Sequence, residues 1–175
     1  MRLDTSHGIS ATEIVNTWSF EKLAHIFRMY GDEPRAGFIA KKIIESRGNK
    51  PITTTEELAN IVTKAWRDSV TRIFQALRIA VNDEYVSLEK MLPIACDKLA
   101  SGGTLAIISF HSGEDRIVKH FLREKAEPER DPVTGQDIQL GILELLNKKP
   151  ITPGEKELST NPRARSALLR IARKR

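Results

Sequence analysis

A short apolar run that leads directly into a cluster of polar side chains constrains the fold of this chain most. Gly102 and Gly103 form a turn, residues 104–109 are typical of a strand, and a helical pattern follows from about residue 114. Open α/β sheets place their chemistry where a strand leads into a helix. Residues 105–108 lack polar alternation, which predicts a strand covered on both faces. The cluster is either a functional site or a cap for the helix, and its members are Ser109, His111, Ser112, Glu114, Asp115 and Arg116.

The composition of the 175 residues, 40% hydrophobic and 29% charged, is typical of a globular protein. No apolar run is long enough to cross a bilayer, and no signal-peptide core follows Met1. The single cysteine, Cys96, excludes a disulfide framework and a multi-cysteine metal site. We therefore expect a cytoplasmic protein without a metal and without a membrane partner.

The net charge of +5 is compatible with binding a polyanion. The position of the charge is more informative, because cations crowd the carboxyl-terminal segment: Lys148, Lys149, Arg163, Arg165, Arg170, Arg173, Lys174 and Arg175. This segment is either a surface that binds a polyanion or a solvated basic tail.

Residues 10–99 follow a helical pattern almost throughout. Ser10 with Glu13, and Thr54 with Glu57, have the spacing of capping boxes, in which each side chain satisfies a free backbone N–H. These boxes predict where two of the helices begin.

The last helix of this region is expected over residues 84–99, with Pro93 kinking or dividing it. Just before it, Arg78 is expected to pair with Asp83 or Glu84 rather than with RNA.

The remaining chain predicts a small sheet. A helix is expected over about residues 114–123, a surface loop over 124–139, a strand within 142–151 and a final strand over 167–172. About three strands with one crossover helix make a poor sheet, and an unpaired apolar edge favours association. The chain therefore has the pattern of the back part of a larger α/β fold, and we expect self-association or a partner.

Several motifs occur in a fixed order along the whole chain. They are Met1-Arg2-Leu3-Asp4, Gly8-Ile9-Ser10-Ala11, Val15-Asn16, Leu23-Ala24-His25-Ile26-Phe27, Tyr30-Gly31, Phe74-Gln75-Ala76-Leu77-Arg78-Ile79-Ala80-Val81-Asn82-Asp83-Glu84, Ser109-Phe110-His111-Ser112, Glu114-Asp115-Arg116-Ile117-Val118-Lys119 and Asn161-Pro162-Arg163-Ala164-Arg165-Ser166-Ala167. With these motifs the sequence closely resembles the RsmH or MraW family of ribosomal small-subunit RNA cytosine-N4 methyltransferases.

The resemblance implies an α/β chain that is the C-terminal part of a Rossmann-like methyltransferase fold with an inserted all-helical substrate lobe. Residues 1–9 would end one core segment, residues 10–67 would form the lobe, and residues 68–175 would form the C-terminal part of the core. The implied reaction is S-adenosylmethionine-dependent N4-methylation of a cytidine in the decoding region of small-subunit rRNA, so the implied partner is that rRNA or the 30S subunit.

The sequence also departs from the family pattern. The glycine-rich loop and acidic ribose-binding residue of the family precede the motif at Met1, so no residue of this chain is assigned to cofactor binding. A separate N-terminal half is therefore a candidate partner. Gly113 stands where the family usually has leucine.

Residue chemistry completes the hypothesis. Asp4, Ser109 and His111 have side chains suited to contacting a cytosine edge or accepting a proton, and are the candidate catalytic residues. The candidate RNA-binding residues are Arg2, Arg116, Arg163 and Arg165. The alternative is a non-catalytic RNA-binding or ribosome-assembly module; a helical DNA-binding protein is disfavoured because the strand-end cluster would then have no role.

Overall fold

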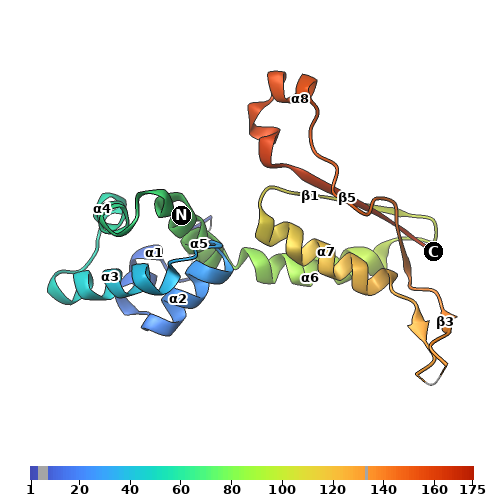
Figure 1. Ribbon diagram of the computed structural model, residues 1–175, viewed down its shortest axis with the longest axis horizontal. Coiled ribbons are helices and arrows are strands. Elements are labelled where there is room, and N and C mark those ends of the chain that lie inside the picture. The colour runs from blue at the N-terminus through green and yellow to red at the C-terminus, as the bar shows by residue number, and fades with distance from the viewer. Residues whose placement is uncertain (4–7, 133) are drawn as a thin grey trace. The chain divides into compact units, whose positions relative to one another are not determined.

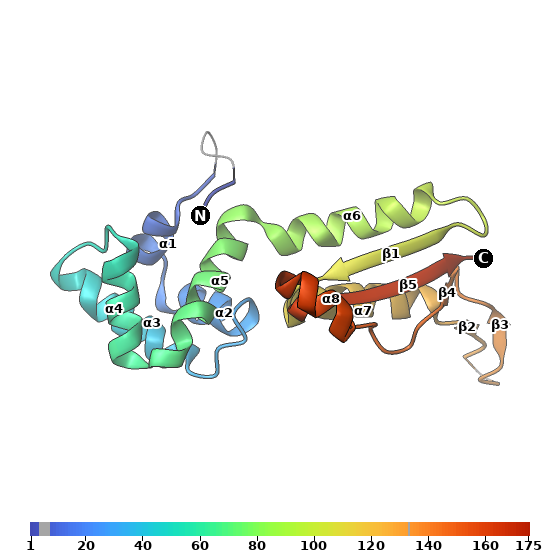
Figure 2. The ribbon, with the colours of Figure 1, turned by 90° about the horizontal axis from the view of Figure 1, so that it is seen from above.

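The computed structural model describes residues 1–3, 8–132 and 134–175, which divide into two compact units, residues 1–84 and 85–175 (Figures 1 and 2). Among these residues no helix is both long and apolar enough to cross a bilayer. Each unit has a hydrophobic core of its own.

The first unit is wholly helical. Its elements are α1 (Ala11–Thr17), α2 (Phe20–Met29), α3 (Ala36–Asn49), α4 (Thr55–Ala65), the 3-10 turn η1 (Arg67–Ser69) and α5 (Val70–Asn82). Apolar side chains that recur at helical spacing, such as Leu23, Phe27 and Ile39, are completely buried in one core.

Helix α5 contributes Ile73 and Leu77 to this same core, where both are fully buried. The compact unit therefore extends past residue 67, the expected end of the helical lobe. The role of residues 10–67 as a substrate lobe stays a prediction. Within α5, Arg78 makes two hydrogen bonds of 2.9 Å to the Glu84 carboxylate, which confirms the expected ion pair.

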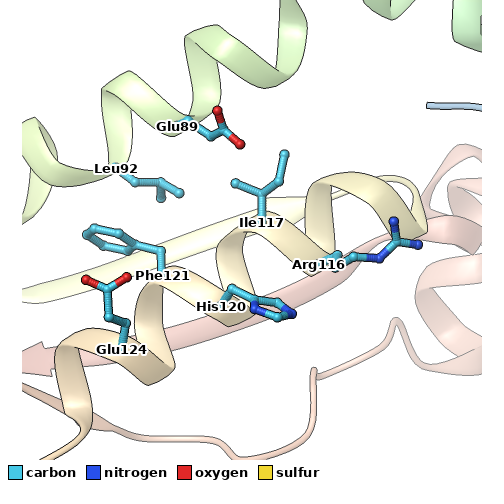
Figure 3. A pocket seen from close by; sticks show the side chains of 7 residues that line it. All are labelled: Glu89, Leu92, Arg116, Ile117, His120, Phe121 and Glu124. Atoms are coloured by element: carbon cyan, nitrogen blue, oxygen red, sulfur yellow. The ribbon is translucent and has the colours of Figure 1, made fainter. Parts of the chain in front are cut away.

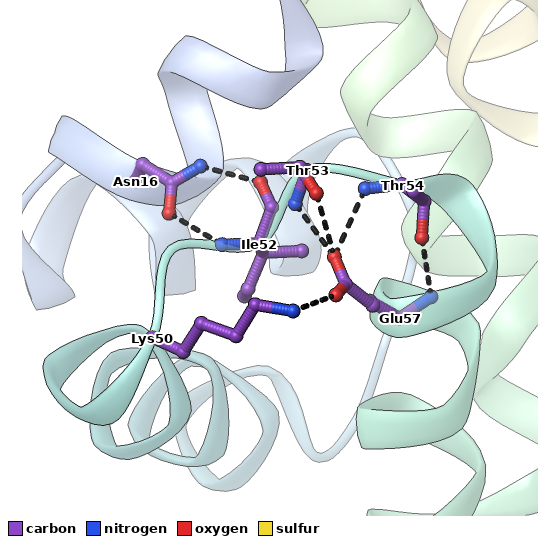
Figure 4. A network of polar contacts seen from close by, with 6 residues as sticks. All are labelled: Asn16, Lys50, Ile52, Thr53, Thr54 and Glu57. Carbon is purple, nitrogen blue, oxygen red and sulfur yellow. Dashed lines mark hydrogen bonds and ion pairs between the residues drawn. The ribbon is translucent and has the colours of Figure 1, made fainter.

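The start of α4 is fixed by a network around Glu57 (Figure 4). The Thr54 hydroxyl accepts from the Glu57 amide at 3.1 Å, and the Glu57 carboxylate accepts from the Thr54 amide at 3.1 Å, so the predicted capping box is confirmed. The carboxylate also accepts from the Thr53 amide and from Lys50 Nζ. The Lys50 hydrogen bond, with those from Thr53 and Thr54, lowers the pKa of Glu57 to about 2.

The second unit combines helices with two small sheets. Its elements are α6 (Glu84–Lys98, beginning at the unit boundary), β1 (Thr104–Ser109), α7 (Ser112–Ala126), β2 (Glu129–Arg130), β3 (Asp137–Gln139), β4 (Leu143–Leu145), α8 (Glu155–Thr160), the 3-10 turn η2 (Pro162–Ser166) and β5 (Leu168–Lys174). The main sheet has the antiparallel order β1-β5-β4, with Thr104 opposite Arg173 and Ser109 opposite Leu168.

Helices α6 and α7 cover one face of this sheet (Figure 1). Leu105 and Ile107 of β1 pack against the core formed with α6 and α7, whereas Ala106 is exposed and Ile108 is 58% exposed. The prediction of a strand covered on both faces is therefore wrong within the described residues, because β1 is an edge strand with helices on one side only.

Two local expectations also need correction, and a third is corrected in part. Pro93 does not divide α6, which continues through it to Lys98, so the kink at Pro93 stays a prediction. Helix α7 continues beyond residue 123 to Ala126. The segment expected to be a loop contains the paired strands β2 and β3, which form a short antiparallel ribbon. The strand at residues 104–109 and the final strand are confirmed, the latter as Leu168–Lys174.

The lowered pKa of Glu57 predicts acid sensitivity of the first unit. A carboxyl whose pKa is lower in the folded protein stabilises it above the ordinary pKa of 4.5, and this contribution is lost as the pH falls towards about 2. In Glu57→Gln the loss of stability between pH 5 and pH 2 should shrink, as measured by hydrogen exchange of the α4 amides. Glu56→Gln, an exposed neighbour in the same turn, is the control; identical pH profiles for both variants would contradict the prediction.

Candidate functional site

The turn between β1 and α7 holds the polar cluster that the sequence singled out. His111 is the N-cap of α7, and its Nδ1 accepts from the Glu114 amide at 3.4 Å. In return Glu114 Oε2 accepts from the Phe110 amide at 2.8 Å. These reciprocal contacts resemble a capping box and satisfy backbone donors at the helix start. The helix-cap interpretation is thus confirmed for His111 and Glu114, and the other ring nitrogen of His111, Nε2, is buried.

The carboxylate of Glu114 is held in its charged form. Burial raises the pKa of Glu114, but the hydrogen bonds from His111 and from the Phe110 amide outweigh it and lower the pKa below its usual value. His111 Nε2 lies 3.4 Å from Glu114 Oε1, and the ring centroid of Tyr85 lies 5.8 Å from that of the imidazole. The imidazole is therefore held between a carboxylate and an aromatic ring.

Ser109 ends β1 with its side chain on the helix-covered face. The residue is 2% exposed, and its Oγ has no hydrogen-bond partner among the described residues. Buried hydroxyls are normally hydrogen-bonded. Ser109 is therefore a polar atom at the strand end that could be satisfied by a bound group.

An ion pair ties the start of α7 to β5. Arg170 Nε donates to Asp115 Oδ1 at 2.7 Å, and Arg170 Nη2 donates to Asp115 Oδ2 at 2.8 Å. The side chains of Arg170 and Asp115 are only 9% and 15% exposed. Such bidentate geometry is strong and directional, so it fixes the helix start against the sheet.

The candidate RNA-binding arginines fall in three places. Arg163 and Arg165 are exposed in η2, immediately before β5. Because β5 runs antiparallel to β1, they lie at the same end of the sheet as Ser109. Arg116 is exposed in the first turns of α7, and Arg2, in the other unit, donates to the Gly8 carbonyl at 3.3 Å. Asp4 lies outside the described residues.

A cavity of about 370 Å³ lies between α6 and α7 (Figure 3). Leu92, Ile117 and Phe121 provide its apolar wall. Two carboxylates, Glu89 and Glu124, line it together with Arg116 and His120. This balance of charges gives the cavity no preference for an anion.

A second cavity, of about 350 Å³, lies between α7 and the β4 and β5 strands, and we call it the basic pocket. It is lined by Lys119, Leu122, Arg123, Leu145, Asn147, Lys148 and Arg170. Lys119 and Arg123 are not among the site residues expected from the sequence. Their spacing of four, which puts both on one helix face, was the available signal.

Gly113 leaves room for the ring of Tyr85. A Cβ at Gly113 would collide with the Tyr85 hydroxyl and would lie 2.6 Å from Tyr85 Cζ. The Tyr85 ring, which is 9% exposed, therefore occupies the space of a side chain at position 113.

All of residues 1–175 match the MraW methylase family. The chain is 45% identical over 185 residues to the ribosomal RNA small subunit methyltransferase H of Legionella pneumophila (strain Paris), covering 99% of this chain and 59% of that protein. It is 46% identical over 180 residues to the protein of the same name from a Cyanothece species, covering 99% and 55%. The corresponding Oenococcus oeni protein is 43% identical over 186 residues. The chain thus spans 55–59% of the length of these relatives.

Breaking the Asp115–Arg170 pair should destabilise the second unit. Asp115→Ala leaves Arg170 buried without its partner, which costs about 3 kcal/mol of unfolding free energy. The double variant Asp115→Leu with Arg170→Met should recover most of this loss. Hydrogen exchange of β5 amides in the full chain measures both. Glu45→Ala, which breaks the exposed pair with Lys42, should leave the same amides unchanged; a double variant no more stable than Asp115→Ala would refute the pair's role.

The fit of Tyr85 against Gly113 predicts a coupled pair of substitutions. Gly113→Ala should destabilise the second unit by about 1–3 kcal/mol, because it forces a methyl group into the tyrosine ring. Adding Tyr85→Leu should recover part of that loss, although Tyr85→Leu alone is destabilising. Chemical denaturation of the four proteins in this cycle measures the coupling, and strict additivity would argue against the steric explanation.

Proposed function

The chain belongs to the MraW methylase family, and from that membership we propose that it forms the carboxyl-terminal part of an RNA methyltransferase that acts on small-subunit rRNA. The reaction we propose is N4-methylation of a cytidine in the decoding region. The observation that carries the proposal is the polar strand end at Ser109 and His111, because a strand end that leads into a helix is where α/β sheets place their sites.

At this strand end the chain's own residues would hold the target base. The exocyclic nitrogen of cytosine is a poor nucleophile, so its placement supplies much of the rate. The Ser109 Oγ and the His111 Nε2, which are both buried and have no hydrogen-bond partner among the described residues, are suited to hydrogen bonds with a cytosine edge. Asp4 is the third residue we propose for this role, on the basis of the resemblance.

The RNA backbone would be held by arginines near the same strand end. Arg163 and Arg165 are exposed at the end of the sheet that carries Ser109, which supports their assignment to phosphates. Arg116 and Arg2 are further proposed contacts. The helical unit would then recognise the substrate as an inserted lobe of a Rossmann-like fold.

The described residues do not by themselves fit S-adenosylmethionine. At the β1–α7 turn the Glu114 carboxylate accepts from the Phe110 amide, and His111 Nδ1 accepts from the Glu114 amide, so both side chains already serve as the cap of α7. We propose that the cofactor is held by protein corresponding to the part of the relatives that this chain does not match, on the same or a separate polypeptide. The free edge and the exposed face of β1 are suited to that contact, or to self-association.

The alternative is an RNA-binding or ribosome-assembly module without catalysis. The exposed Arg163 and Arg165 and the free edge of β1 favour it, because such a module needs RNA contacts and protein contacts. Both functions require RNA binding, so RNA binding alone does not distinguish them. They differ in whether the chain, once joined to a cofactor-binding half, transfers a methyl group to the RNA.

His111 gives the sharpest test, because one substitution keeps its cap and removes its imidazole. Asparagine is a good N-cap, so His111→Asn should keep the melting temperature. In a chimera with the amino-terminal part of the Legionella relative, it should lower the single-turnover rate on saturating rRNA about 10²-fold. His111→Ala should lose both rate and stability, and Asp4→Asn should lower the rate with little loss of RNA binding.

Mass spectrometry of the methylated cytidine measures these rates. A wild-type rate for His111→Asn would mean that His111 only caps α7. A chimera that binds rRNA and S-adenosylmethionine without methyl transfer would favour the assembly module.

A further inference from the structure

The basic pocket combines four cations with almost no neutralising charge. Arg170 is paired with Asp115 through bonds of 2.7 and 2.8 Å. Lys119, Arg123 and Lys148 form no ion pair or side-chain hydrogen bond with any described residue, and no carboxylate lines the cavity. The pocket therefore presents about three uncompensated positive charges around one space.

Two elements bring the three cations of the pocket together. Lys119 and Arg123 are four residues apart on α7 and therefore lie on one helix face, where their like charges repel each other. Lys148, which follows β4, brings a third positive charge to the same cavity. An anion in the pocket would relieve this repulsion.

The pocket wall is held rigidly by Asn147. Its amide donates to the carbonyls of Lys149 and Leu169 at 2.8 and 3.0 Å, and its Oδ1 accepts from the Ile171 amide at 2.7 Å. These bonds fix the segment that carries Lys148 against β5. The cations thus surround a preformed cavity, unlike those of a mobile basic tail.

The lining also limits the class of anion. Leu122, which is 2% exposed, and the half-buried Leu145 form the apolar part of the wall. The lining contains no aromatic ring on which a free base could stack and no carboxylate to bind ribose hydroxyls. The pocket therefore suits a phosphate group whose nucleoside is held elsewhere, as in a polynucleotide backbone.

We propose that the basic pocket binds a backbone phosphate of the RNA substrate, separately from Arg163 and Arg165. The proposal rests on the proposed function, because it requires that the chain binds RNA. It adds an anchor on the side of α7 that faces β4 and β5, and it fixes the register of the RNA rather than reading its bases.

Lysine footprinting of the full chain tests this contact directly. Reductive methylation is followed by mass spectrometry, with and without a single-stranded RNA oligonucleotide of the decoding-region sequence. Lys119 and Lys148 should be modified several-fold more slowly with RNA. Lys90 and Lys98, exposed on α6 and outside the pocket, are internal controls and should be unaffected. Equal protection of all four lysines, or none, would overturn the proposal.

A pair of double variants measures the contribution to binding. Lys119→Gln with Lys148→Gln should lower the slope of log affinity against log salt by about 0.7, which is the contribution of one phosphate contact to a single strand. Lys90→Gln with Lys98→Gln removes the same charge outside the pocket and should change the slope much less. Equal slopes for the two double variants would overturn the pocket assignment.

Two results separate the failure of this proposal from that of the proposed function. If the wild-type chain binds RNA and footprinting leaves Lys119 and Lys148 unprotected, the pocket fails and the RNA function stands. If the chain binds no RNA, both fail. The footprinting is repeated with orthophosphate in place of RNA. If orthophosphate protects Lys119 and Lys148 and RNA does not, the pocket binds a small phosphorylated ligand and the RNA contact is overturned.

Discussion

The ion pair between Asp115 and Arg170 joins α7, whose start carries the candidate site, to β5, which lines the basic pocket. It connects the first turn of α7 to β5 with two short hydrogen bonds in a site that is largely shielded from water. Because the β1–α7 turn must meet that fixed helix start, the pair also sets where His111 and Ser109 lie. It neutralises Arg170 within the basic pocket, so the charge presented there comes from the three cations without partners.

Local sequence signals predicted much of this fold. The capping box at Thr54 and Glu57 and the glycine turn before β1 act through neighbouring residues, so the sequence alone locates them. Features that depend on distant partners were missed. Burial of β1 depends on which strands and helices pack beside it, and an apolar run without alternation does not distinguish an edge strand from a central one. The β2–β3 ribbon lies in a charged segment with too little apolar patterning to predict strands.

The candidate site and the basic pocket also differ in how far the sequence alone predicts them. Ser109 and His111 follow one strand in the sequence, so their proximity was predictable, as was the possibility that His111 caps the helix. The basic pocket was not predictable, because its cations come from three separate segments: α7, the segment after β4, and β5. Only the spacing of Lys119 and Arg123 is visible locally, and the approach of Lys148 depends on strand pairing and on the three hydrogen bonds of Asn147.

The contact between Tyr85 and Gly113 has a consequence for how this chain can have diverged. A side chain at position 113 and the tyrosine ring at position 85 require the same space. A side chain at position 113 is therefore compatible with this fold only when position 85 carries a smaller residue than tyrosine. The effect of a substitution at either site depends on the residue at the other, so the two sites form an epistatic pair rather than two independent positions.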